Sequence, residues 1–276
     1  MHGRGEEFRL VLIFDLDGVV YLGDTPIPGA VESLNALAAQ GHSLYYLTNN
    51  STRSRLTYVD KLTRMGLPTT AEQVMTSAFA TGLYLKGLGA EGKSVFVVGE
   101  EGLREEMAAI GMRVLSLEDG SPADYVVAGL DRTFTYAKLQ RAHHEITLNG
   151  ATFVATNRDA TYPMETGEIP GGGAIVAPIE YSTGVAGATV GKPEPGGWLG
   201  ILKLSGAEPA ETLMVGDRPE TDIMGAKRIG LHTALVLTGV TQVSTIAALP
   251  EEQQPDHVLQ NLTQLAALVE RLSGGL

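Results

Sequence analysis

The chain has 276 residues, of which 43% are hydrophobic, and its 32 acidic against 20 basic residues give a formal net charge of −12. This length suits one large domain or two modest ones, and the composition can build a full core. The negative charge disfavours nucleic acid and anionic membranes as partners. Because the chain has no cysteine, disulfides, thiolate catalysis and cysteine-based zinc sites are excluded.

The sequence also bears on location. It has no run of 18 apolar residues of the kind that predicts a membrane-spanning helix. Residues 1–10 lack the apolar segment of a signal peptide. We therefore expect a cytoplasmic protein.

Strands alternate with helices from the start of the chain. We predict a strand at 9–14, a helix from Pro28 to Gly41, a strand at 43–47 and a helix at 54–65. Both strands are short apolar runs that end in polar residues. Such runs are typical of a parallel sheet that is buried on both faces.

The alternation continues to the end of the chain. Further strands are predicted at 94–98, 124–128, 152–155, 188–190, 212–215 and 233–237, and helices at 100–110, 135–148, 198–204, 219–229 and 262–272. Apart from residues 157–159, charged residues directly after a predicted strand occur only in the first and last thirds of the chain. We therefore predict an α/β fold, with a Rossmann-like doubly wound parallel sheet formed by 1–79 and 183–276 and a second α/β domain, 80–182, inserted into it.

Ligands of an open parallel sheet bind at the carboxyl ends of its strands, where Asp15 and Asp17 follow the first strand. Their spacing places both carboxylates on one side, with Leu16 facing the core. One carboxylate can attack phosphorus while the other exchanges a proton with the leaving oxygen. The alternative is a polar Asp-Gly turn at 17–18.

Three other strand ends carry groups that suit phosphoryl transfer. Asp217 offers a hard oxygen ligand for Mg²⁺, while Asp222 either supports that metal or complements a helix dipole. Lys192 either stabilises phosphate oxygens or lies in a surface loop. Thr48 and the backbone amides after it can cradle phosphate, which is compatible with helix capping by residues 51–54.

Together these segments resemble a known family. DLDGVVYLGD at 15–24, TNNSTRS at 48–54, GKP at 191–193 and GDRPETDI at 216–223 resemble the four ordered motifs of the haloacid dehalogenase-like superfamily. Within it the chain is similar to subfamily IIA, the NagD-like, nitrophenyl phosphatase and phosphoglycolate phosphatase type. In that subfamily a large α/β cap domain of the C2 type is inserted between the second and third motifs.

The resemblance implies a magnesium-dependent phosphatase that hydrolyses small phosphate monoesters through an aspartyl phosphate on Asp15. Asp17 would be the general acid and then the base for water, and Lys192 would bridge nucleophile and phosphate. The other implied roles are metal binding by Asp15, the backbone carbonyl of Asp17, Asp217 and Asp222, phosphoryl binding by Thr48, Asn49 and Asn50, and substrate contacts by Asn157, Arg158 and Lys192.

Substrate and partners are left open by the motifs. TNRDATYP at 156–163 looks like the cap loop of the subfamily, with Arg158 where proline is usual. This arginine either favours a substrate with a second anionic group or is a solvated loop residue. Phosphoglycolate, nucleotides, sugar phosphates and glycerol phosphate are candidate substrates, and a homodimer through the cap is implied. The alternative function is a non-catalytic phosphate sensor or scaffold on the same fold.

Overall fold

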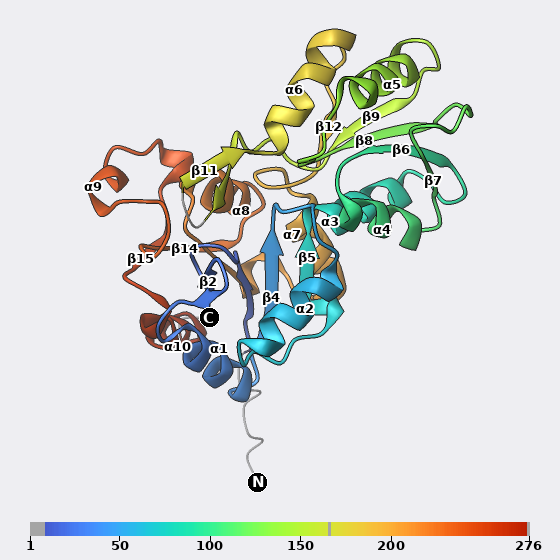
Figure 1. The fold of residues 1–276 in the computed structure, drawn as a ribbon. Coiled ribbons are helices and arrows are strands. Elements are labelled where there is room, and N and C mark those ends of the chain that lie inside the picture. The colour runs from blue at the N-terminus through green and yellow to red at the C-terminus, as the bar shows by residue number, and fades with distance from the viewer. Residues whose placement is uncertain (1–8, 165–166, 275–276) are drawn as a thin grey trace. The chain divides into compact units, whose positions relative to one another are not determined.

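The computed structural model describes residues 9–164 and 167–274, and the chain divides into two compact units (Figure 1). Of the described residues, the first unit comprises those within 9–47, 62–73 and 201–274, and the second comprises those within 48–61, 74–164 and 167–200. The sequence-based boundaries at 79/80 and 182/183 divide the chain at other points and stay a prediction. The expected lack of a signal peptide concerns residues 1–10, of which 1–8 lie outside the described residues.

A parallel β-sheet forms the centre of the first unit, with strand order β15-β14-β13-β1-β4. Every residue of β1 and β13 is buried, as expected for strands that are covered on both faces. The strands are β1 (Val11–Phe14), β4 (Ser43–Thr48), β13 (Thr212–Gly216), β14 (His232–Val236) and β15 (His257–Leu259). The short antiparallel pair β2 (Tyr21–Leu22) and β3 (Thr25–Pro26) follows β1.

Helices connect these strands, as a parallel sheet requires. They are α1 (Ala30–Ala39), α8 (Met224–Arg228), α9 (Val243–Ile246) and α10 (Leu265–Gly274), while α2 (Arg55–Arg64) and α7 (Gly196–Ser205) each span a boundary of the two units. The predicted helix at 219–229 is a π-helical turn at Pro219–Ile223 followed by α8. None of the described helices is long and apolar enough to cross a membrane.

The second unit has its own parallel sheet, with order β12-β9-β8-β6-β7. Its strands are β6 (Ser94–Val98), β7 (Arg113–Leu115), β8 (Tyr125–Ala128), β9 (Thr152–Ala155) and β12 (Ala188–Thr189), and the unit also holds β5 (Val74–Thr76) and the antiparallel pair β10 (Thr161–Met164) and β11 (Gly167–Pro170). Its helices are α3 (Ser77–Gly87), α4 (Glu101–Ala109), α5 (Tyr136–Thr147) and α6 (Gly172–Thr183).

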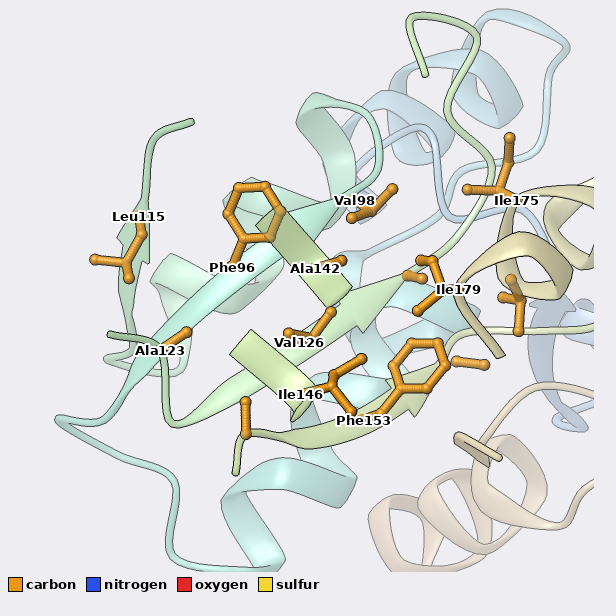
Figure 2. Packing of buried hydrophobic residues seen from close by; sticks show 14 residues of the cluster. Phe96, Val98, Leu115, Ala123, Val126, Ala142, Ile146, Phe153, Ile175 and Ile179 are labelled. Atoms are coloured by element: carbon orange, nitrogen blue, oxygen red, sulfur yellow. The ribbon is translucent and has the colours of Figure 1, made fainter. Parts of the chain in front are cut away.

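A hydrophobic cluster on this sheet explains how the second unit holds together (Figure 2). Phe96, Val126 and Phe153 from three neighbouring strands pack against Ile146 of α5 and Ile179 of α6. Each of these side chains is at least 93% removed from solvent. The second unit therefore has a hydrophobic core of its own. Burying each large apolar side chain contributes about 1.5–3 kcal/mol to the free energy of folding. The predicted α/β fold, with parallel sheets and an additional α/β block, is confirmed.

Candidate functional site

Three buried aspartates lie together at the carboxyl ends of β1 and β13 in the first unit. Asp15 directly follows β1, Asp217 directly follows β13, and Asp222 belongs to the π-helical turn after it. One carboxylate oxygen from each lies within 4.8 Å of the others, and each side chain is at most 8% exposed. The structure thus brings together three of the four predicted metal-binding residues.

The loop after β14 holds Asp217 in place. The backbone N–H of Val240 donates to Oδ2 of Asp217 at 2.9 Å, and the Thr241 hydroxyl donates to its carbonyl oxygen at 2.6 Å. A Cβ on Gly239 would fall on this carboxylate, and one on Gly18 would lie 2.7 Å from Oδ2. Glycine at both positions therefore lets two loops close around Asp217.

Asp222 is anchored by backbone donors. Its Oδ2 accepts hydrogen bonds from the N–H groups of Asp217 and Arg218, both at 3.1 Å. Gly216 makes this approach possible, since a Cβ there would lie 2.5 Å from Cγ of Asp222. Asp222 therefore orients the backbone that carries Asp217, while its support of a metal ion stays a prediction.

These aspartates form a donor set that suits a hard divalent cation, since Mg²⁺ prefers carboxylate oxygen. Three buried carboxylates that converge this closely repel one another unless a positive charge is present. The residues therefore fit a divalent metal ion.

Asp17 lies two residues beyond Asp15 and is half-buried, while the intervening Leu16 is fully buried, as expected. The Thr238 hydroxyl donates to the carbonyl oxygen of Gly18 at 2.6 Å and fixes the turn that follows. The side chain of Asp17 is not one of the three clustered carboxylates, and metal binding through its backbone carbonyl stays a prediction.

The second predicted motif forms a tight polar turn at the end of β4. Oγ1 of Thr48 accepts the N–H of Asn50 at 3.2 Å. Oδ1 of Asn50 in turn accepts the N–H and the hydroxyl of Thr52, both at 2.8 Å, and its Nδ2 donates to the Tyr162 hydroxyl at 3.0 Å. The side chain of Asn50 is thus engaged within the second unit.

Asn49 and Lys192, 143 residues apart in the chain, are joined by two hydrogen bonds. The backbone N–H of Lys192 donates to Oδ1 of Asn49 at 2.8 Å, and Nδ2 of Asn49 donates to the carbonyl oxygen of Lys192 at 2.9 Å. Lys192 is 4% exposed, so it is a buried lysine rather than a surface one. The second and third predicted motifs therefore meet through a backbone clamp.

The predicted substrate contacts of the inserted block lie in the loop after β9. Asn157 is 4% exposed, and its Oδ1 accepts the Thr156 hydroxyl at 2.9 Å. The guanidinium of Arg158 donates to both carboxylate oxygens of Glu180, at 2.5 and 2.8 Å, and to the Thr189 hydroxyl at 2.6 Å. This pairing raises the pKa of Arg158 and lowers that of Glu180. Substrate contact by Asn157 and Arg158 stays a prediction.

The loop 238–241 is the part of the site that sequence reasoning missed. It follows β14, a predicted strand, and its sequence Thr-Gly-Val-Thr contains two polar threonines and a glycine. The signal used for the other strand ends, a polar loop at the carboxyl end of a buried strand, was therefore present. It was overlooked because the loop carries no charged residue.

Comparison with known proteins agrees with these features. A family model described as haloacid dehalogenase-like hydrolase matches residues 12–113, and one described as HAD-hydrolase-like matches residues 189–265. An acid sugar phosphatase of Staphylococcus aureus is 36% identical over 266 residues, which cover 96% of this chain and 100% of that relative.

Solved structures agree as well. A p-nitrophenyl phosphatase from Archaeoglobus fulgidus is 32% identical with a TM-score of 0.87, covering 94% of this chain and 99% of that one. A glycerol phosphate phosphatase from Mycobacterium tuberculosis, solved with magnesium, is 35% identical with a TM-score of 0.85, covering 94% and 76%. The predicted enzyme class, a phosphatase, is confirmed. From both family models and the nearly full-length likeness to these relatives, we conclude that the chain belongs to the haloacid dehalogenase-like hydrolases.

Proposed function

We propose that the protein is a Mg²⁺-dependent phosphatase that hydrolyses small phosphate monoesters through an aspartyl-phosphate intermediate on Asp15. The observation that carries this proposal is the convergence of Asp15, Asp217 and Asp222 within 4.8 Å at the ends of two parallel strands. The similar proteins named for action on sugar phosphate, nitrophenyl phosphate and glycerol phosphate support small esters as substrates.

Asp15, Asp217 and Asp222 would hold Mg²⁺ through their carboxylates, and Asp17 through its backbone carbonyl. When bound, the ion neutralises the negative charge of the phosphate and of the attacking carboxylate. Without such neutralisation two anions would have to approach each other, and phosphate monoester hydrolysis is among the slowest uncatalysed reactions.

The chemical steps fall to two aspartates. A carboxylate oxygen of Asp15 forms a bond to phosphorus while the ester P–O bond breaks, and Asp17 donates its proton to the leaving oxygen. Asp17 then takes a proton from water as that water attacks phosphorus. Cleavage of the aspartyl phosphate releases inorganic phosphate and restores both carboxyl groups to their starting states.

Substrate binding is assigned to residues of the second unit. Thr48 and the backbone amides that follow it, with Lys192, would neutralise and orient the phosphoryl oxygens. Asn49 and Asn50 would shape this cradle, and Asn157 and Arg158 are proposed to act on the rest of the ester. The Glu180 partner of Arg158 already neutralises much of its charge, so an anionic substrate group would have to compete with Glu180.

A homodimer remains part of the proposal. Tyr136 and Tyr181, on α5 and α6 of the second unit, are 78% and 93% exposed, and Leu148 just after α5 is 75% exposed. We propose that these exposed side chains take part in the contact between two copies of the chain, since apolar surface that is gathered in a patch marks protein interaction sites. Light scattering coupled to size-exclusion chromatography would give twice the 29.2 kDa chain mass for a dimer.

Phosphate release from a panel of small esters tests the catalytic proposal. The panel is run with Mg²⁺ and with EDTA for the wild type and Asp15→Asn. Asp124→Asn is the control, because Asp124 directly precedes β8, at the amino end of that strand. We expect Mg²⁺-dependent release that is lost in Asp15→Asn and kept in Asp124→Asn. Release that persists in Asp15→Asn would refute the nucleophile assignment. No release from any ester with wild type would favour the alternative of a phosphate sensor.

A further inference from the structure

The side-chain amide of Asn49 has a second partner besides Lys192. Its Nδ2 also donates to the carboxylate of Asp159, at 3.0 Å to Oδ1 and 3.1 Å to Oδ2. One amide hydrogen therefore faces Lys192 and the other faces Asp159, while Oδ1 accepts the Lys192 N–H. Both N–H donors and the oxygen of the amide are thus engaged within the second unit.

Asp159 lies in the loop 156–160, which is fixed by the three glycines at 171–173. The N–H of Gly173 donates to the Asp159 carbonyl at 2.9 Å. A Cβ on Gly172 would lie 2.6 Å from Oδ1 of Asn157, and one on Gly173 would lie 2.5 Å from the carbonyl oxygen of Arg158. These glycines therefore serve close packing of the start of α6 on this loop.

The neighbouring residue adds a second fixing point. Arg158 ties the same loop to Glu180 of α6 and to Thr189 of β12 through charge-assisted and neutral hydrogen bonds. Because Arg158 and Asp159 are consecutive, an anchored Arg158 limits the positions that Asp159 can take. Asp159 is half-buried, so its bond to Asn49 is partly shielded from competing water.

The other end of the clamp is equally constrained. The N–H of Gly191 donates to the carbonyl oxygen of Thr156 at 2.7 Å, and a Cβ on Gly191 would lie 2.7 Å from Oδ1 of Asn49. The backbone at 191–192 is therefore pressed against the amide and against the beginning of the Asp159 loop. The amide has little room to turn without displacing Lys192.

From these contacts we propose that Asp159 is a positioning residue for Lys192 and acts through the side-chain amide of Asn49. A carboxylate only accepts hydrogen bonds, so Asp159 selects the amide orientation in which NH₂ faces it. In that orientation Oδ1 meets the Lys192 N–H and Nδ2 meets the Lys192 carbonyl. The catalytic consequence rests on the phosphatase function proposed above, because Lys192 is there assigned to the phosphoryl group.

A double-mutant cycle tests the route through Asn49. Phosphate release is measured for the wild type, Asp159→Ala, Asn49→Ala and the double variant, with Asp159→Asn as the conservative change. Loss of a charge-assisted hydrogen bond predicts a fall in kcat/KM of about 10- to 100-fold in Asp159→Ala. Asp159→Asn, which keeps an acceptor oxygen, recovers part of this loss. The double variant is no worse than Asn49→Ala, because both changes break one pathway.

Hydrogen exchange supplies a readout that needs no turnover. In protein labelled with ¹⁵N-lysine, the Lys192 amide exchanges about tenfold faster in Asp159→Ala than in wild type, because its acceptor Asn49 has lost its anchor. Asp124→Ala is the matched control. The Asp124 carboxylate also accepts two hydrogen bonds, from the N–H and hydroxyl of Ser94 at 2.8 and 2.7 Å, yet it makes no bond in this clamp.

The two readouts separate this inference from the proposed function. Wild type that releases no phosphate would overturn the phosphatase proposal. The positioning role would still be supported if the Lys192 amide exchanges faster in Asp159→Ala than in wild type. The positioning role would be overturned if the losses in kcat/KM of the two single variants add in the double variant. It would also be overturned if the Lys192 amide exchanges equally fast in wild type and in Asp159→Ala. Equal acceleration by Asp124→Ala would also overturn it, since that result indicates general loosening of the unit.

Discussion

Replacing Gly239 with alanine probes how closely the first unit is built around Asp217. The added Cβ would fall on the carboxylate and lie 2.6 Å from Cβ of Asp217, with two carboxylate atoms closer still, whereas ordinary contact begins at 3.4 Å. The loop or the aspartate must therefore move by more than about 1 Å to restore normal separations. Misplacement by that distance can cost about 100-fold in rate, and disturbing groups that orient a metal ligand costs about 10- to 100-fold in metal affinity. We expect both effects in Gly239→Ala.

Isothermal titration calorimetry with Mg²⁺ and initial rates of phosphate release measure the two effects. Gly87→Ala is the matched control, because it makes the same chemical change at a position with nothing within 4 Å of the new Cβ. It should keep Mg²⁺ affinity and rate near wild type. A Gly239→Ala protein that binds Mg²⁺ and turns over like the control would show that Asp217 does not depend on this loop.

Three further changes test the packing of the second unit. Arg158 lowers the pKa of Glu180 below its ordinary value of 4.5. The stabilising contribution of the ionised Glu180 is therefore present above that value and is lost as pH falls through the lowered pKa. In Glu180→Gln the melting temperature should depend less on pH between about pH 5 and 3 than in wild type. The hydroxyl of Ser51 is buried with no partner among the described residues, so Ser51→Ala should change the free energy of unfolding by less than about 1 kcal/mol in urea titration. Glu106 is 5% exposed and bonds Arg55 at 3.1 Å, so Glu106→Ala should destabilise by about 2 kcal/mol, whereas an unchanged urea midpoint would contradict this pairing.

The parallel strands could be predicted because their apolar runs are unambiguous. Val11–Phe14 and Thr212–Gly216 are continuous buried segments, and the predicted ends of both strands lie within two residues of the observed ends. Helix α6 was not predicted, because it begins with Gly172 and Gly173 and contains Pro178. These residues disfavour an isolated helix. Tertiary packing of Ile175 and Ile179 into the core of the second unit stabilises it instead.

In the candidate site, charged residues could be predicted and their supports could not. Asp15, Asp217 and Asp222 follow buried strands, and the rule that ligands bind at strand ends is enough to group them. The contact of Asn49 with Asp159 joins residues 110 positions apart, and no local pattern in one sequence encodes such a pairing. The three glycines at 171–173 can be recognised in the sequence, but their structural role depends on which loop packs against them.

The supports share a physical logic that the charges alone do not reveal. Backbone N–H groups hold Asp217 and Asp222, and the neutral amide of Asn49 holds the backbone of Lys192. Neutral donors fix a carboxylate without cancelling its charge, which is then available to a metal ion; a lysine or arginine in the same place would compete with that ion. In the same way, Asn49 bonds the backbone N–H and carbonyl oxygen of Lys192 and not its ammonium group. Each of these supports therefore fixes the position of a buried charged residue through neutral groups.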